Sequence, residues 1–389
     1  MSAQPITDAG PTRRLVLQAG VSLPAVLGLA SRSARAAPAR SIDSHQEDRI
    51  RGLVADYMKA FEVPGLSLAY GRGPEVLLAR AFGLADRETG ETVRVDSLFR
   101  IASLSKSITS AATFSLVESG VLRITDRPFA ADGLLRAYAQ SPKRADWVRA
   151  IMVHHLLTHT SGGWSNDADD PMFHDPGLDA RQLIARTLAA RPPEHPPGEQ
   201  FAYSNFGYCI LGRVIEAATG MPYERYVQRR ILDPVGVRDM RIAAKEPAAR
   251  EVHYYKTSSD DPYALPITRM DSHGGWIATP TDLVRYAGAL FGAVDRHGET
   301  PLLSSASLST ICRGTSANPG YGCGWRLTDT GNVWHTGHLP GSESLLVHAK
   351  DGVTWAVVLN TRDKRNTAMT SALDKLMWRI REAVPRWGR

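Results

Sequence analysis

The chain has 389 residues, a formal net charge of +6, and no low-complexity or repeated segment. Residues 1–36 hold four arginines and one aspartate, so the net charge of the remainder is only +3. A charge this small, with no block of lysine and arginine elsewhere, argues against nucleic-acid binding. The length allows a large hydrophobic core and is enough for two domains.

The N-terminus has the features of an export signal. Arg13 and Arg14 form a twin-arginine pair, and an apolar run over residues 15–30 follows them. Polar residues and a proline interrupt that run, and it is shorter than the ~20 apolar residues that a membrane-spanning helix needs. Ala34-Arg35-Ala36 then offers a small-residue cleavage site. We therefore predict a twin-arginine signal peptide over residues 1–36, no stable membrane span, and export by the twin-arginine (Tat) translocase to a bacterial periplasm or beyond it.

Apolar periodicity predicts strands at both ends of the remaining chain and helices between them. A helix over 47–61 precedes a hairpin over 66–70 and 76–82. The predicted helices of the middle are 149–157, 179–189, 207–218, 223–231 and 281–291. Near the C-terminus, strand-like runs cover 332–336, 343–348 and 354–360, and a last helix covers 366–383.

This order of elements predicts an α/β (α+β) fold. The terminal strands must meet in one mixed or mostly antiparallel sheet that helices flank, while the middle of the chain forms a helical insertion packed against it. We expect residues 37–389 to form a single catalytic unit. Its α/β part comprises 37–118 and 272–389, and its mainly helical part comprises 119–271.

Ser103 lies three residues before Lys106, at the point where an extended stretch turns into a helix. One helical turn brings residues i and i+3 onto the same face, so the ammonium group of Lys106 can reach the hydroxyl of Ser103. A serine beside a base is the arrangement required for nucleophilic catalysis. By itself the spacing is common, but Lys106 is the only lysine in the chain with a serine three residues before it.

Two further motifs follow in a set order. Tyr203-Ser204-Asn205 comes second, and His335-Thr336-Gly337-His338 comes near the C-terminus. With the Ser-x-x-Lys motif, they resemble the serine β-lactamase and penicillin-binding protein superfamily. Within it, the chain is most similar to the branch of class C β-lactamases, family VIII esterases and D-aminopeptidases. The resemblance covers nearly all of residues 37–389 and implies a β-lactamase/transpeptidase-like fold with the site between the sheet and the helical part.

The resemblance also implies roles for these residues. Ser103 is expected to form an acyl-enzyme that water releases, with Lys106 and Tyr203 as the base. The sequence leaves open which of those two takes the proton. Substrate binding is expected from Asn205, His335, Thr336, Gly337 and His338. The backbone N–H groups of Ser103 and His338 are expected to hold the oxyanion, and no cofactor or metal is expected.

His335 bears on the substrate. Relatives that capture a substrate carboxylate commonly have a lysine at this position, whereas a histidine is mostly neutral at physiological pH. We therefore predict an exported serine hydrolase that cleaves a small ester or a D-amino-acid amide or peptide. A β-lactamase or DD-carboxypeptidase is the alternative. A penicillin-binding sensor or scaffold with little turnover is an alternative of another class, and acyl transfer to an acceptor other than water remains open.

Three other features carry weaker expectations. Cys312 and Cys323 are the best candidates for a disulfide, although three buried thiols are at least as well supported. The segment 156–162 is expected to make a turn that supports the cleft. The acidic segment 164–176 is expected to be a solvated surface loop rather than a gate over the substrate.

Overall fold

The computed structural model describes residues 42–140, 142–256, 260–292, 301–363, 367–384 and Trp387. The described residues belong to one compact unit. The predicted signal peptide, residues 1–36, lies outside the described residues. Within the described ranges, no helix combines the length and the apolar character needed to cross a membrane.

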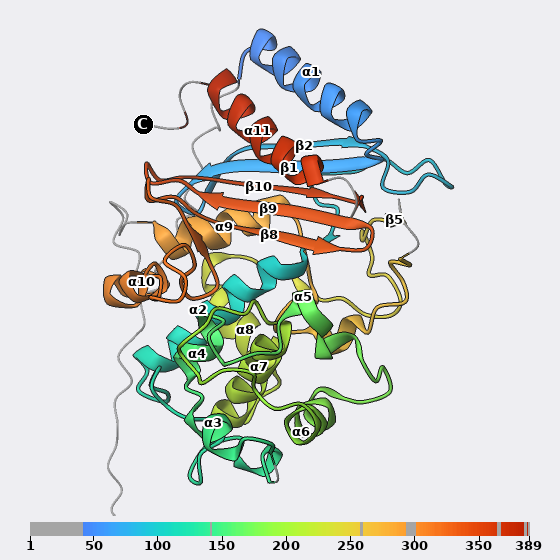
Figure 1. The fold of residues 1–389 in the computed structure, drawn as a ribbon. Helices are drawn as coiled ribbons and strands as arrows, with labels where there is room; N and C mark the ends of the chain where they lie inside the picture. The colour runs from blue at the N-terminus through green and yellow to red at the C-terminus, as the bar shows by residue number, and fades with distance from the viewer. Residues whose placement is uncertain are drawn as a thin grey trace, which may run out of the picture. The chain divides into compact units, whose positions relative to one another are not determined.

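A six-stranded antiparallel sheet forms the centre of the unit (Figure 1). Its strand order is β2-β1-β10-β9-β8-β7, so strands from the two chain ends lie next to each other, with Leu66 of β1 opposite Leu359 of β10. The strands are β1 (Gly65–Arg72), β2 (Glu75–Gly83), β7 (Arg326–Leu327), β8 (Val333–Leu339), β9 (Ser342–His348) and β10 (Val353–Leu359). The prediction of a mostly antiparallel sheet made by both chain ends is confirmed.

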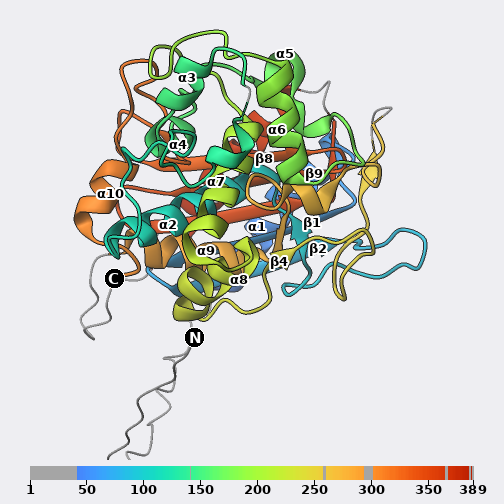
Figure 2. The same ribbon diagram turned by 90° about the horizontal axis from the view of Figure 1, so that it is seen from below.

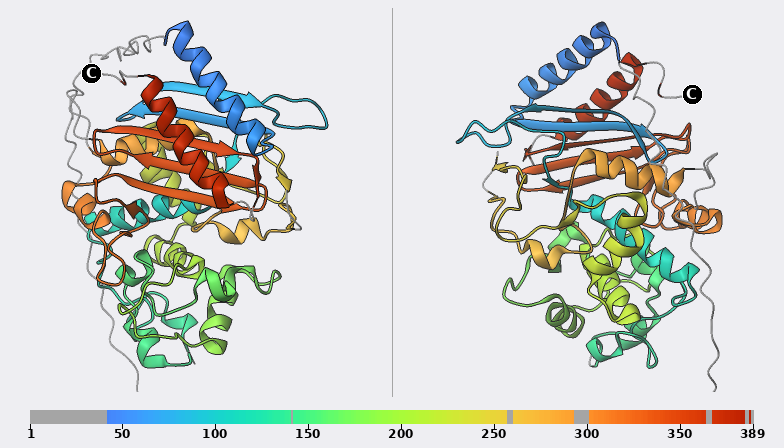
Figure 3. Two further views of the ribbon diagram at one scale, coloured as in Figure 1. Left: turned by 45° about the horizontal axis from the view of Figure 1, so that its top comes forward. Right: turned by 180° about the vertical axis from the view of Figure 1, so that it is seen from behind.

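Helices cover both faces of this sheet (Figures 1 and 3). On one face, α1 (Ser44–Ala60) and α11 (Thr367–Ala383) lie side by side over a core that includes Leu68, Tyr70 and Trp355. On the other face, α2 (Ser105–Glu118) and α9 (Pro280–Phe291) belong to a core with Ala69 and Val358. Since successive residues of a strand point to opposite faces, β1 and β10 contribute alternate side chains to the two cores.

The middle of the chain forms a group of helices on the side of α2 that faces away from the sheet (Figure 1), and these helices lie in front in Figure 2. They are α3 (Ala145–Ala150), α4 (Val153–Leu157), α5 (Asn166–Asp169), α6 (Ala180–Ala190), α7 (Asn205–Thr219) and α8 (Tyr223–Val227). The predicted helix 149–157 is wrong as a single element. It divides into α3 and α4 because the N–H groups of Val153 and His154 donate to carbonyls of Asp126 and Ile124 instead of to a preceding turn. After α8 the chain continues as a π-helix over Gln228–Leu232.

Three small elements complete the fold. A second sheet joins β3 (Phe99–Arg100), β6 (Trp276–Ala278) and β4 (Arg241–Ile242), and it holds the segment just before Ser103. A parallel pair joins β5 (Tyr255–Lys256) to β11 (Thr361–Arg362), and α10 (Ser305–Ile311) precedes β7. Cys209, Cys312 and Cys323 are all free thiols, so the candidate disulfide is not formed in this structure. Cys209 and Cys323 are buried but Cys312 is exposed, so the alternative of three buried thiols is wrong for Cys312.

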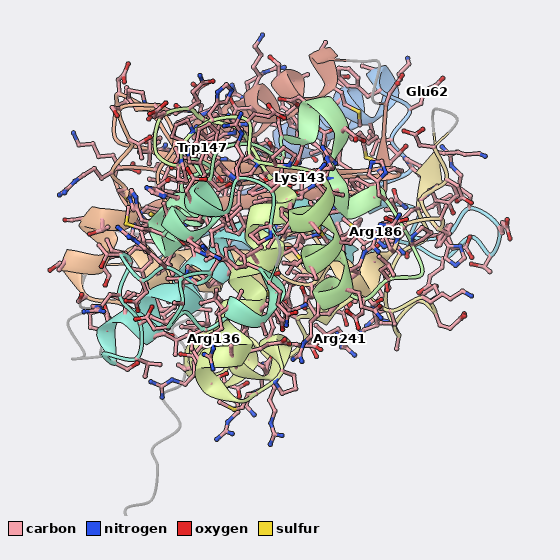
Figure 4. The ribbon with its side chains drawn as sticks, turned by 60° about the horizontal axis from the view of Figure 1, so that its bottom comes forward. Glu62, Arg136, Lys143, Trp147, Arg186 and Arg241 are labelled. Carbon is pink, nitrogen blue, oxygen red and sulfur yellow. The ribbon has the colours of Figure 1, made fainter. Side chains whose placement is uncertain are left out.

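Part of the excess positive charge lies on the outer surface of the helical region. Arg136, Lys143 and Arg186 are exposed, and Figure 4 shows their side chains on the outside of the helices. These residues do not line the cavity described below. The charge of the whole molecule therefore says little about the charge around its site.

Candidate active site

Ser103 lies in a strained turn that a neighbouring strand holds in place. It is the middle residue of a single 3-10 turn, Ala102–Leu104, between β3 and α2, and Ala102 has a positive φ of 49°. Residues with a side chain rarely adopt this conformation, so surrounding contacts must maintain it. The hydroxyl of Ser342 donates to the Arg100 carbonyl at 2.5 Å, and that of Ser344 donates to the Ile101 carbonyl at 2.9 Å. Strand β9 therefore fixes the backbone just before Ser103.

Lys106 is fully buried in the first turn of α2, and its ammonium group has three partners. Nζ lies 3.1 Å from Ser103 Oγ, 2.6 Å from Asn205 Oδ1 and 2.9 Å from the carbonyl oxygen of His273. Burial lowers the pKa of Lys106 to about 7, and the nearby charge of Asp170 opposes that shift. The i, i+3 spacing thus places a lysine that is readily deprotonated beside the serine hydroxyl.

Tyr203 lies on the other side of the same pair. Lys106 Nζ is 4.9 Å from the centroid of the Tyr203 ring. Burial raises the pKa of Tyr203 above its ordinary value, although a hydrogen bond with Ser103 favours the ionised form. The two candidate bases are therefore unequal: the environment favours neutral Lys106 and disfavours the Tyr203 tyrosinate.

Asn205 is held by a carboxylate that the sequence analysis did not single out. Asn205 begins α7, which the hydroxyl of Ser204 caps. Its Nδ2 donates to Asp170 Oδ2 at 2.7 Å while its Oδ1 faces Lys106, so the orientation of the amide is fixed at both atoms. Burial raises the pKa of Asp170, and hydrogen bonds from Met172 and Asn205, together with the charge of Lys106, lower it.

The expectation that 164–176 is a solvated surface loop holds only in part, because Asp167, Asp169, Phe173 and His174 are exposed whereas Asp170, Pro171 and Met172 are buried. Asn166 accepts a hydrogen bond from the backbone N–H of Asn205 at 2.7 Å, and the N–H of Asn166 donates to the Tyr203 carbonyl at 2.8 Å. Asp170 is buried against the second motif. An acidic composition suggests exposure, and only contacts between distant residues reveal that this segment supports Tyr203 and Asn205.

The third motif occupies β8, against the turn that carries Ser103. A Cβ atom added to Gly337 would lie 2.0 Å from the Ile101 carbonyl oxygen and 2.2 Å from Ser344 Oγ. Only glycine permits this approach of β8 to the nucleophile segment. His335 is buried, and both of its ring nitrogens have partners within the protein: Nδ1 lies 2.6 Å from the Thr336 carbonyl oxygen and Nε2 lies 3.1 Å from the Tyr321 hydroxyl.

A cavity of about 890 Å³ joins the three motifs. Its walls include six of the predicted residues, namely Ser103, Tyr203, Asn205, His335, Thr336 and His338. The other two, Lys106 and Gly337, lie directly behind that wall. Five aspartates also line the cavity, against two arginines. These are Asp167, Asp169, Asp170, Asp260 and Asp261, and Arg326 and Arg362. A volume of this size suits a small-molecule or short peptide substrate.

The comparisons with known proteins agree with this fold. The model of a family described as Beta-lactamase matches residues 50–376, which is most of the chain. The chain belongs to the beta-lactamase family. Esterase EstB of Burkholderia gladioli is 32% identical over 268 residues, which cover 64% of this chain and 65% of the esterase. Penicillin-binding protein 4 of Amycolatopsis lactamdurans is 28% identical over 310 residues, which cover 76% of this chain and 78% of that protein.

Solved structures with the same fold superpose over almost the whole described unit. The D-amino acid amidase of Ochrobactrum anthropi SV3, solved in complex with L-phenylalanine amide, has a TM-score of 0.71 and 25% identity, with 88% of this chain and 99% of that chain covered. A β-lactamase/D-alanine carboxypeptidase of Pseudomonas syringae has the same TM-score at 19% identity, a likeness of fold alone. The predicted superfamily and fold are confirmed. Membership of this family is consistent with a serine hydrolase.

Proposed function

We propose that the protein is a serine hydrolase that forms an acyl-enzyme on Ser103. The observation that carries the proposal is the buried Lys106 Nζ, 3.1 Å from Ser103 Oγ, with a pKa of about 7. A neutral amine has two N–H donors and one lone pair. The donors match Asn205 Oδ1 and the His273 carbonyl, and the lone pair is left for the Ser103 hydroxyl proton. Neutral Lys106 is therefore the base in this proposal.

The reaction follows in two half-steps. Lys106 takes the Ser103 proton as Oγ attacks the substrate carbonyl, and the N–H groups of Ser103 and His338 stabilise the negative oxygen. Protonated Lys106 then gives this proton to the leaving alcohol or amine, either directly or through the Tyr203 hydroxyl, which is left neutral. In the second half-step neutral Lys106 accepts a proton from the water that attacks the acyl-enzyme, and this proton passes to Ser103 Oγ as the acid leaves.

We further propose a small ester or a D-amino-acid amide or peptide as the substrate. The lining of the cavity supports this proposal, because aspartates outnumber arginines and no cation stands at position 335. Such a wall attracts a substrate amino group more readily than a carboxylate. The similarity to an esterase and to a D-amino acid amidase points the same way. A β-lactamase or DD-carboxypeptidase is the second candidate, which the similarity to a penicillin-binding protein favours.

The test compares three substrates with the protein from residue 37 onward: a p-nitrophenyl ester, D-phenylalanine amide and a chromogenic cephalosporin. We expect turnover of the ester and the amide to exceed that of the cephalosporin, and Ser103→Ala to abolish it. The matched control is Ser119→Ala, since Ser119 is exposed and outside the cavity. A preference for the cephalosporin would favour a β-lactamase. Stable acylation of Ser103 without turnover would favour a sensor, and products formed with an added alcohol would reveal acyl transfer.

We also propose export through the Tat pathway, on the strength of Arg13, Arg14 and the cleavage site after residue 36. Cell fractionation tests it. The full chain is expected in the periplasm or the medium, and replacement of both arginines by lysine is expected to retain it in the cytoplasm. Export that survives this replacement would argue against the pathway.

A further inference from the structure

Two residues outside the three motifs connect the second motif to the third. The Tyr321 hydroxyl lies 3.1 Å from His159 Nε2 and 3.1 Å from His335 Nε2. At one end, the N–H of Ser204 donates to His159 Nδ1 at 3.1 Å. At the other end, His335 Nδ1 lies 2.6 Å from the Thr336 carbonyl oxygen. We call the three side chains of His159, Tyr321 and His335 the His–Tyr–His bridge.

The ends of the bridge fix the position of every proton in it. Because His159 Nδ1 accepts from a backbone N–H, a neutral His159 must carry its proton on Nε2, and this proton points at Tyr321. Because His335 Nδ1 faces a carbonyl oxygen, a neutral His335 must carry its proton on Nδ1, so its Nε2 can only accept. The Tyr321 hydroxyl therefore accepts from His159 and donates to His335. Tyr321 keeps a second lone pair, and the Tyr208 hydroxyl, which donates to the Leu157 carbonyl at 2.8 Å, is a further hydrogen-bonding neighbour of Tyr321.

The bridge is buried, and its backbone is strained at His159, so surrounding contacts must stabilise it. His159, Tyr321 and His335 are each about 1% exposed. His159 also has a positive φ of 57°, which is uncommon for a residue with a side chain. The ring of His159 packs 4.3 Å from that of Tyr203 and 5.0 Å from that of Tyr208, measured between centroids. The bridge thus contacts the proposed catalytic tyrosine as well as the third motif.

We propose that His159 and Tyr321 are positioning residues, which hold His335 as the neutral Nδ1–H tautomer and lock strand β8 to the segment that carries Tyr203 and Asn205. This proposal rests on the proposed function for its effect on rate. It also limits the substrate, since the Nε2 lone pair of His335 is already used and the ring offers no charge to a carboxylate.

The charges around the bridge support neutral rings. The groups that act on His159 are Arg326, Lys106 in its protonated form and His335, and the same arginine and lysine act on His335 together with His338. Three tyrosines, Tyr203, Tyr208 and Tyr321, pack on the His159 ring, and no carboxylate is among the groups that shift either histidine. Burial and these groups hold the pKa of both histidines well below the ordinary value.

The first test reads the tautomers directly. Long-range ¹H–¹⁵N spectra of the ¹⁵N-histidine-labelled protein at pH 7, assigned with His159→Asn and His335→Asn, are expected to show the Nε2–H form for His159 and the Nδ1–H form for His335. A charged His335, or a His335 that carries its proton on Nε2, would overturn the bridge. This result is independent of any activity, so failure of the bridge and failure of the proposed function are distinguishable.

The second test measures kinetics for the ester substrate. Tyr321→Phe removes only the bridging hydroxyl. His159→Asn keeps an acceptor for the Ser204 N–H, and asparagine tolerates a positive φ, but the donor to Tyr321 is lost. We expect each variant to lower kcat about tenfold with KM within twofold of the wild type. The double variant should be no slower than the slower single variant, because both changes break the same bridge.

The matched control is Tyr226→Phe. Tyr226 is also buried and its hydroxyl contacts Ser115 Oγ at 2.7 Å, but it does not line the cavity. Its kcat should stay within twofold of the wild type. Unchanged kcat in the Tyr321 and His159 variants, or effects that multiply in the double variant, would overturn the positioning role. Should one variant fail to fold, the other variant and the wild-type tautomers still decide the question.

Discussion

At the scale of single residues, catalysis in the proposed mechanism depends on whether Lys106 carries a proton. Three acceptors surround its Nζ, and burial brings its pKa to about 7. A base must be unprotonated, so kcat/KM for a neutral ester is expected to rise with pH and to level off above about 7. The measurement is a pH–rate profile from pH 5 to 10. A rise that begins only above pH 9 would instead identify the Tyr203 tyrosinate as the base.

A substitution of Asp170 gives a second test of Lys106 as the base. The charge of Asp170 raises the Lys106 pKa, and its Oδ2 accepts from Asn205 Nδ2. Asp170→Asn removes the charge but keeps an oxygen for that hydrogen bond. We expect the acidic limb of the profile to move to lower pH by at least about half a pH unit. Asp167→Asn, at an exposed residue of the same cavity, is the control and should leave the limb in place.

The residues that the sequence analysis found and those that it missed differ in a physical way. Ser103 and Lys106 are recognisable because one helical turn fixes their relation. The contact between Asp170 and Asn205 joins residues 35 apart, and that between His159 and Tyr321 joins residues 162 apart. The segment 156–162, which contains His159, was expected to support the cleft, but its partner Tyr321 was not foreseen. Such contacts depend on the packing of distant segments, and no local pattern encodes them.

At the scale of elements, strand β8 has to approach the nucleophile turn closely. Gly337→Ala would place a methyl group 2.0 Å from the Ile101 carbonyl oxygen. We expect β8 to shift, the free energy of unfolding to fall by about 1–3 kcal/mol and kcat/KM to fall about 100-fold. Chemical denaturation and ester kinetics measure the two effects.

The control is the same change in an exposed helix. Gly52 lies in α1 with no atom near its missing Cβ. Gly52→Ala should raise the free energy of unfolding by about 0.5–1 kcal/mol, because alanine is the better helix former, and should leave kcat/KM unchanged. If Gly337→Ala were as stable as Gly52→Ala, β8 would have to accommodate a side chain at position 337.

Strands and helices were predicted about equally well. The runs 354–360 and 343–348 agree with β10 (Val353–Leu359) and β9 (Ser342–His348) to within one residue at each end, and the predicted helices 179–189 and 281–291 agree as closely with α6 and α9. The helix predicted over 149–157 failed because a loop accepts hydrogen bonds from its middle. A helical pattern reports which face is buried, but it does not report where the backbone N–H groups find their acceptors.

At the scale of the whole molecule, the sheet separates two hydrophobic cores, of which only one surrounds the candidate active site. One core joins α2 and α9 to the sheet and extends among the helices of the middle of the chain, where Ser103, Lys106, Tyr203 and Asn205 lie. The other lies between the sheet and the helices α1 and α11, and it contains Ile50, Tyr70 and Ile380. Stability and activity should therefore respond differently to substitutions in the second core.

Ile380→Ala tests this separation. Ile380 is fully buried near the C-terminal end of α11, about 15 Å along the helix from Thr370, whose hydroxyl contacts His338. The lost side chain should lower the free energy of unfolding by about 2–4 kcal/mol. The value of kcat/KM per folded molecule should stay within twofold of the wild type, because the sheet lies between the two cores. Urea unfolding and ester kinetics on the same samples measure both.

The control for that experiment is Leu134→Ala, since Leu134 is 44% exposed. Its free energy of unfolding should change by no more than about 0.5 kcal/mol. A loss of kcat/KM in Ile380→Ala as large as its loss of stability would contradict the separation, because it would mean that packing between α11 and the sheet also sets the position of β8. The two faces of the sheet would then act as one cooperative unit, and the site would depend on the contact between the chain ends.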